Sequence, residues 1–117
     1  MSRRVVVTGL GALTPVGNNV SDFWKNLLDG VSGAGPITRF DSTQFKTQFA
    51  CEVKDFVPTD FLDRKEARKL DMYAIYAMVA VSEAMADSKL DLEQIDLDRA
   101  GVIWGSGIGG LDTFLKE

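Results

Sequence analysis

The segment Met72–Val81, with the sequence MYAIYAMVAV, runs for ten residues without a charge inside a long predicted helix. That helix extends from about Asp60 or Asp63 to about Ser88. A surface helix carries polar residues on its outer face every three or four positions, whereas this one is apolar on all sides for nearly three turns. It has to be covered from several directions, and 117 residues supply little material for that. The stretch indicates a piece of something larger or an obligate oligomer; the alternative is a surface helix whose alanines tolerate exposure.

The composition is that of a folded protein without export signals. Apolar residues make up 45% and charged residues 26% of the chain, which is the balance of one globular domain. No run approaches the roughly 18 apolar residues that cross a bilayer. The apolar run at Val5–Val7 is broken at once by Thr8 and Gly9, so it forms no secretory signal. We therefore expect a cytoplasmic protein with no membrane partner, whose single cysteine forms no internal disulfide.

The charge and the absence of histidine exclude several classes of function. Seventeen acidic against thirteen basic residues give a net charge of -4, which argues against nucleic acid as a partner. The chain has no histidine, so it offers no histidine base, no Ser-His or Cys-His pair and no histidine metal ligand. We expect no metal site and no catalytic residue within these 117 residues.

The remaining elements follow from hydrophobic runs and breakers. Two apolar runs predict buried strands and an alternating run predicts an exposed or edge strand. A serine N-cap and a closing glycine predict a short helix, and a further helix start follows the last glycines. The strands are Arg4–Gly11, Ala100–Trp104 and Phe49–Phe56, the short helix is Asp22–Leu28 between Ser21 and Gly30, and the last helix starts at Leu111.

The loop after the first strand, TGLGALTPVG, invites a dinucleotide-binding interpretation that its spacing does not support. Gly9 and Gly11 fit the first two glycines of a G-x-G-x-x-G pattern, but Thr14 replaces the third. Pro15 follows, and the next helix starts only near Ser21, so the helix terminus that should hold a phosphate is displaced. We favour structural glycines in a turn from strand to loop and expect no nucleotide cofactor.

A second glycine loop, GSGIGG at Gly105–Gly110, requires a sharp turn or a close approach of the backbone. It is not a nucleophile elbow, because Trp104 and not glycine stands two positions before Ser106, and no lysine follows that would make a Walker loop. Ile108 stands alone among the glycines. It is presented either into a cavity or against a partner chain, or it lies in the core of a tight turn, and the residues alone do not decide.

The basic cluster comprises Arg64, Lys65, Arg68 and Lys69, whose offsets place them on one side of a helix. In the first turns of the predicted long helix, positive charge opposes the macrodipole at a cost of roughly 0.3–1 kcal/mol per group. Concentrated positive charge on an acidic protein suggests a docking patch for an acidic partner. The alternative is a solvated helix start, which is what most charge runs are.

The single cysteine, Cys51, lies in the middle of the predicted strand Phe49–Phe56. It is not at a helix N-terminus and has no histidine to lower its pKa. We expect a buried small apolar residue and not a nucleophile.

Four motifs occur in family order: RRVVVTGLGALTPVGN, FACEVKDF, DRKEARKLDMY and GVIWGSGIGGL. Together they resemble the amino-terminal part of the β-ketoacyl-acyl-carrier-protein synthases, most closely the type II condensing enzymes (synthase II) of bacterial fatty-acid elongation. The resemblance covers essentially all of residues 1–117, which would be an incomplete synthase domain with no internal boundary. One departure is Trp104, where a small or aliphatic residue is expected.

The resemblance implies an α/β fold of the thiolase-like kind, layered α-β-α-β-α, of which this chain is part of the amino-terminal half, usually in a homodimer. It also implies acyl transfer by a cysteine and two histidines beyond Glu117, on substrates carried by the phosphopantetheine arm of acyl carrier protein, without another cofactor. Within this chain it implies docking of acyl carrier protein at Lys65, Arg68 and Lys69, and Gly107 and Ile108 bordering the acyl-chain pocket. The alternative is a non-catalytic homologue that binds carrier protein or a partner subunit.

Overall fold

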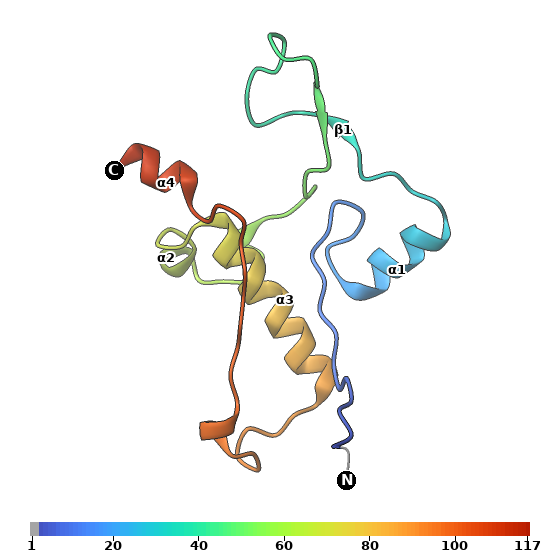
Figure 1. The fold of residues 1–117 in the computed structure, drawn as a ribbon, viewed down its shortest axis with the longest axis vertical. Helices are drawn as coiled ribbons and strands as arrows, with labels where there is room; N and C mark the ends of the chain where they lie inside the picture. The colour runs from blue at the N-terminus through green and yellow to red at the C-terminus, as the bar shows by residue number, and fades with distance from the viewer. Residues whose placement is uncertain (1–2) are drawn as a thin grey trace. The chain divides into compact units, whose positions relative to one another are not determined.

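The computed structural model describes residues 3–117, which form two compact units. One unit combines the N-terminal segment, up to Gly11, with everything from Val57 onward, and the other spans Ala12–Phe56. Figure 1 shows the order of the helices and strands along the chain. The expectation of a single synthase domain without an internal boundary stays a prediction.

The unit Ala12–Phe56 contains helix α1, Val20–Leu28. Its N-cap is Asn19, whose side-chain oxygen accepts a hydrogen bond of 2.8 Å from the backbone N–H of Asp22. The prediction of Ser21 as N-cap is therefore wrong by two residues, because asparagine caps a helix as well as serine does and stands earlier. The predicted closure at Gly30 is confirmed, since this glycine adopts the left-handed region at φ 69° just after the helix.

The same unit contains a short antiparallel ladder of β1, Gly35–Pro36, and β2, Phe49–Ala50. The predicted strand Phe49–Phe56 is confirmed only in its first two residues. The ladder is limited by its partner, because Pro36 has no N–H to donate and β1 is only two residues long. Farther along, Asp55 adopts φ 52°, which no extended strand can contain.

In the other unit, the predicted continuous helix is broken into three elements. They are a 3₁₀ turn at Pro58–Asp60, helix α2 at Arg64–Ala67 and helix α3 at Met72–Ser88. The prediction of one helix is wrong because Asp71 takes an extended conformation, with ψ 153°, and starts α3 as a new N-cap. The predicted end at Ser88 is confirmed, and Lys89 follows in the left-handed region at φ 52°.

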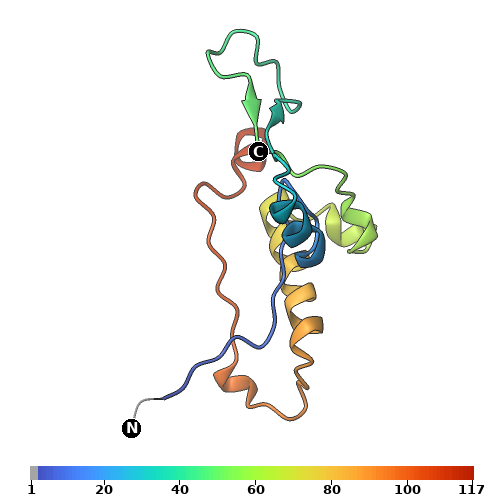
Figure 2. The ribbon, with the colours of Figure 1, turned by 90° about the vertical axis from the view of Figure 1, so that its right-hand side faces the viewer.

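The N-terminal segment lies along α3 at two glycines, where the two are neighbours in Figures 1 and 2. A Cβ added to Gly9 would lie 2.7 Å from the backbone nitrogen of Ser88, and one added to Gly11 would lie 2.9 Å from that of Ala84. The N–H of Leu10, between them, donates a 2.9 Å hydrogen bond to the Asp87 carboxylate. The interpretation of both glycines as structural is therefore supported by close approach of backbone to helix.

The buried strands expected at Arg4–Gly11 and Ala100–Trp104 are wrong for this structure, because neither run forms a ladder with any described residue. Val5 is 91% exposed and Ile103 is 99% exposed. A strand is stabilised only when a neighbour accepts and donates its backbone hydrogen bonds, and no such neighbour exists within residues 3–117.

The apolar stretch of α3 supplies the two buried hydrophobic side chains among the described residues, Ile75 at 2% and Val79 at 5% exposed. These residues are four apart, so they share one face of the helix. Met78, on another face, remains 42% exposed. The helix is thus covered on one side only by the residues that the structure describes.

Two smaller elements complete this unit. A 3₁₀ turn spans Leu97–Arg99, and helix α4, Leu111–Lys116, confirms the predicted helix start at Leu111. Within residues 3–117, no helix combines the length and apolar character needed to span a bilayer.

Candidate functional site

The basic cluster Arg64, Lys65, Arg68 and Lys69 lies on and just after α2, and all four residues are exposed. Asp63 starts this helix, because its carboxylate accepts a 2.7 Å hydrogen bond from the Lys65 N–H. None of the four cations forms an ion pair with any residue that the structure describes. The turn therefore holds four unpaired positive charges in six consecutive positions.

The electrostatics of this cluster differ from the sequence-based expectation. The four cations do not occupy the first turns of a long helix, because α2 ends at Ala67 and Asp71 starts α3 separately. Arg68 is the C-cap of α2, where the helix dipole favours a cation. The predicted unfavourable interaction with the long helix is thus absent at this end of the cluster, and the charges are presented on a short turn.

The glycine loop Gly105–Gly110 has an open first half and a constrained second half. Nothing lies within 4 Å of a Cβ placed on Gly105 or Gly107. Gly109 adopts φ 76°, and its N–H donates a 3.0 Å hydrogen bond to the Ser106 hydroxyl. Ile108 is 77% exposed, so the interpretation that placed it in the core of a tight turn is wrong for this structure.

Sequence reasoning missed the residues that hold the second half of this loop. Asp71 and Tyr73, at the start of α3, contact Gly110 and Gly109, and Asp71 also accepts a hydrogen bond from the Thr113 hydroxyl. The sequence signal was an aspartate just before an uncharged helix, which indicates an N-cap but does not identify a partner 42 residues away.

The first glycine-containing loop leads into a cavity of about 310 Å³ within the unit Ala12–Phe56. A narrow turn forms one wall, where Thr14 and Gly17 exchange two backbone hydrogen bonds of 2.8 and 3.2 Å. Asn26 of α1 donates to the Val16 carbonyl and holds the turn against the helix. The cavity is lined by Thr14, Pro15, Val16, Gly17, Asn18, Asp22, Asn26, Val31, Ser32, Lys54 and Asp55.

The start of α1 is poorly suited to bind a phosphate. The Asn19 side chain already accepts the N–H of Asp22 and donates a 2.7 Å hydrogen bond to the Asp22 carboxylate. That carboxylate brings negative charge to the first turn, where an anionic ligand would otherwise be favoured. This arrangement supports the sequence-based preference for structural glycines over a dinucleotide site.

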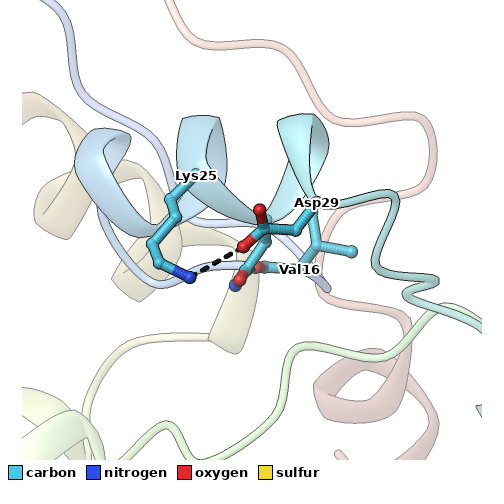
Figure 3. Close-up of polar contacts among 4 residues, drawn as sticks. Val16, Lys25 and Asp29 are labelled. Atoms are coloured by element: carbon cyan, nitrogen blue, oxygen red, sulfur yellow. Dashed lines mark hydrogen bonds and ion pairs between the residues drawn. The ribbon is translucent and has the colours of Figure 1, made fainter.

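An ion pair lies on α1 between Lys25 and Asp29, with Nζ and Oδ2 2.7 Å apart (Figure 3). Their side chains are 72% and 53% exposed, so solvent screens most of the attraction. The lysine precedes the acid by four positions, which is the less favourable order relative to the helix dipole. We assign this pair no functional role.

Two carboxylates on the loop between β1 and β2 and beside it have lowered pKa values. The Thr43 N–H donates 3.0 Å to Asp41 and lowers the pKa of that carboxyl below its ordinary value. The Thr38 hydroxyl and N–H donate 2.6 and 3.2 Å to Glu52 and lower its pKa in the same way. In each case, the hydrogen bonds favour the charged form.

Cys51 is exposed, so the expectation of a buried cysteine is wrong. The ladder that should have buried it ends at Ala50, one residue earlier. No group of three or more cysteine, aspartate or glutamate side chains that could hold a metal ion occurs among the described residues.

Curated relatives share about half of their aligned residues with this chain. It is 50% identical over 109 residues to the 3-oxoacyl-[acyl-carrier-protein] synthase 2 of Synechocystis sp. (strain ATCC 27184 / PCC 6803 / Kazusa), which covers 93% of the chain and 26% of the relative. It is 51% identical over 115 residues to the synthase 2 of Coxiella burnetii (strain RSA 493 / Nine Mile phase I), covering 98% and 28%. The chain thus spans about a quarter of the length of these relatives.

Two solved structures resemble this one. The ishigamide ketosynthase/chain length factor matches with a TM-score of 0.71 and 36% identity, over 80% of this chain and 23% of that one. A type II polyketide ketosynthase, AntDE, in complex with its acyl carrier protein AntF matches with a TM-score of 0.62 and 28% identity, over 84% and 24%. The mixed helix-and-strand fold is therefore that of a segment of a ketosynthase.

The family model described as "Beta-ketoacyl synthase, N-terminal domain" matches residues 2–117, which is nearly the whole chain. The four motifs that carried the resemblance all lie within this range. The chain therefore belongs to the β-ketoacyl synthase family and corresponds to its N-terminal domain.

Proposed function

We propose that residues 1–117 are the amino-terminal part of a fatty-acid-elongating condensing enzyme, a 3-oxoacyl-acyl-carrier-protein synthase II. The reaction joins an acyl thioester and malonyl-acyl-carrier-protein to give 3-oxoacyl-acyl-carrier-protein, CO₂ and free carrier. The observation that carries the proposal is the family match over residues 2–117, together with about 50% identity to synthases named for this activity. The nucleophilic cysteine and the two histidines of this chemistry belong to the rest of the enzyme, so this segment has no turnover alone.

The first contribution of this segment is to dock acyl carrier protein through Lys65, Arg68 and Lys69. The four exposed charges of the basic cluster have no acidic partner among the described residues, so they are free to attract an acidic protein. The solved ketosynthase that resembles this chain is itself in complex with its acyl carrier protein, which supports the same kind of partner here.

The second contribution is to border the acyl-chain pocket with Gly107 and Ile108. Ile108 projects from a loop whose neighbouring glycines leave space around it, and its side chain is mostly exposed. A bulky apolar residue on such a loop excludes chains sterically, and one methylene in a hydrophobic pocket changes selectivity by roughly 10- to 200-fold.

The complete enzyme would have the layered α-β-α-β-α thiolase-like architecture and form a cytoplasmic homodimer. Its substrates would be delivered on the phosphopantetheine arm of the carrier, with no other cofactor. The extensive exposed apolar surface of this segment, such as Val5 at 91% and Ile103 at 99%, supports further layers covering it.

The docking proposal is tested in the complete polypeptide that carries this segment. Reversing the charge at Arg68 and Lys69 to glutamate should raise the KM for malonyl-acyl-carrier-protein roughly tenfold or more at low salt, and little at high salt, because rim charges act mainly through attraction. Lys46→Glu, an exposed cation outside the cluster, is the matched control and should leave KM unchanged. Equal KM values for both variants would contradict docking at the basic cluster.

The same assay tests the reaction itself. Release of CO₂ and formation of 3-oxoacyl-acyl-carrier-protein by the complete polypeptide are expected. Carrier binding without either product would favour the alternative, a non-catalytic homologue that binds carrier protein or a partner subunit.

A further inference from the structure

The end of the glycine loop is joined to the start of α3 by side chains that are distant in sequence. The hydroxyl of Thr113, in the first turn of α4, donates a hydrogen bond to Oδ1 of Asp71 across 42 positions. Asp71 is the N-cap residue of α3, yet its side chain accepts no hydrogen bond from that helix. An aspartate at this position ordinarily accepts a backbone N–H of the first turn. Asp71 instead binds the segment that follows the loop.

The same carboxylate lies against the backbone of the last loop residue. A Cβ placed on Gly110 would lie 2.5 Å from Cγ of Asp71 and 2.9 Å from its Oδ1. Such distances leave no space for any side chain, so residue 110 has to be glycine for Asp71 to reach Thr113. The contact therefore depends on three residues acting together.

The preceding loop residue contacts the next turn of α3. A Cβ position on Gly109 lies 3.9 Å from a ring carbon of Tyr73, which is ordinary van der Waals distance. Gly109 adopts φ 76°, a conformation that favours glycine. Its N–H is tied back to Ser106 by a 3.0 Å hydrogen bond. The turn around Ile108 thus ends on a fixed surface made by the start of α3.

The first part of the loop has no comparable contact. Nothing lies within 4 Å of a Cβ on Gly105 or Gly107, and Ile108 is 77% exposed. The position of the Ile108 side chain is consequently set by the two glycines that follow it and by their contact with α3.

We propose that Asp71 and Thr113 are positioning residues that hold the loop carrying Ile108 against the start of α3, and that this contact sets the acyl chain length the enzyme prefers. The first half of this proposal concerns the structure alone. The second half rests on the proposed function, because it requires Ile108 to border an acyl-chain pocket.

The structural half is tested in the 117-residue chain with an isosteric substitution that removes only the hydroxyl, Thr113→Val. The nuclear Overhauser effect between the Tyr73 ring and the Gly109 Hα protons reports whether the loop lies on α3. Thr113→Val should abolish most of this signal and speed exchange of the Gly109 amide roughly tenfold, since a hydrogen bond to a charged group is lost. Thr113→Ser, which keeps the hydroxyl, should restore both.

Two controls separate positioning from general stability. Thr59→Val removes an exposed hydroxyl that makes no hydrogen bond with the described residues, and it should leave the signal intact. The resonances of Ile75 and Val79 report on the buried face of α3. If Thr113→Val leaves the Tyr73–Gly109 signal unchanged, or loses it only together with the Ile75 and Val79 resonances, the positioning role is overturned.

The functional half is tested with the same variants in the complete synthase. Thr113→Val should change the ratio of kcat/KM for long against short acyl substrates several-fold, leave the KM for the carrier unchanged, and be rescued by Thr113→Ser. An unchanged ratio overturns the selectivity half. If the unsubstituted synthase produces no 3-oxoacyl product, the proposed function fails, while the outcome of the magnetic-resonance experiment still decides the structural half.

Discussion

Replacing Gly11 by alanine tests whether the N-terminal segment really packs its backbone on α3. A Cβ at this position would lie 2.9 Å from the backbone carbon of Ala80 and 2.9 Å from the backbone nitrogen of Ala84. Both obstacles are main-chain atoms of a regular helix, which cannot rotate away as a flexible side chain can. The segment would have to move off α3 or the helix would have to shift.

The size of the effect follows from two opposing terms. Overpacking of this kind costs about 1–3 kcal/mol. Alanine restricts the unfolded chain more than glycine does and offsets about 0.4–1 kcal/mol of that cost. Gly11 does not occupy the left-handed region, so no backbone strain adds to the sum. We expect the free energy of unfolding to fall by about 1–2 kcal/mol.

The measurement is denaturant unfolding of the 117-residue chain beside the same substitution at Gly101, in the same unit. Nothing lies within 4 Å of a Cβ on Gly101, and this residue also avoids the left-handed region. Gly101→Ala should therefore be neutral or stabilise by up to about 1 kcal/mol. Equal stabilities of the two variants, with unchanged dependence on denaturant, would refute the close packing of the N-terminal segment on α3.

Three further predictions concern the unit Ala12–Phe56. Thr38→Val should raise the pKa of Glu52 toward its ordinary value in an NMR titration; because folding lowers this pKa, the stabilising contribution of Glu52 is complete above the unfolded pKa and is lost as pH falls through the folded one. A Glu52 pKa that does not move would contradict this. Asn19→Ala should lower the free energy of unfolding by about 1 kcal/mol through loss of the α1 cap. Lys25→Ala should change it by less than about 0.5 kcal/mol, since its ion pair with Asp29 is exposed; denaturant unfolding measures both, and a larger loss for Lys25→Ala than for Asn19→Ala would reverse the assignment.

Local signals predicted those elements whose causes lie within a few residues. The position of α1, its closure at Gly30 and the start of α4 at Leu111 were all predicted within two residues. Caps and turn glycines act over three or four positions, so a short window of sequence contains the interacting groups. The interpretation of Gly9 and Gly11 as structural also held, although the helix they contact could not be named in advance.

Elements that depend on a distant partner were predicted poorly. The strand Phe49–Phe56 shortened to two residues because its partner β1 ends at Pro36. The same shortening left Cys51 exposed, against expectation. β-branched composition indicates that a run suits a strand, but only a neighbouring strand can satisfy its backbone hydrogen bonds.

The candidate site shows the same division. The sequence alone identified the basic cluster, the glycine loop around Ile108 and the family to which their order belongs, because these depend on residue type and spacing along the chain. Only the tertiary structure decided that the helix breaks at Asp71 and that this carboxylate binds Thr113. A side chain that can cap its own helix or bind a distant hydroxyl has two comparable partners, and the choice between them is made only when residues 42 positions apart are brought together.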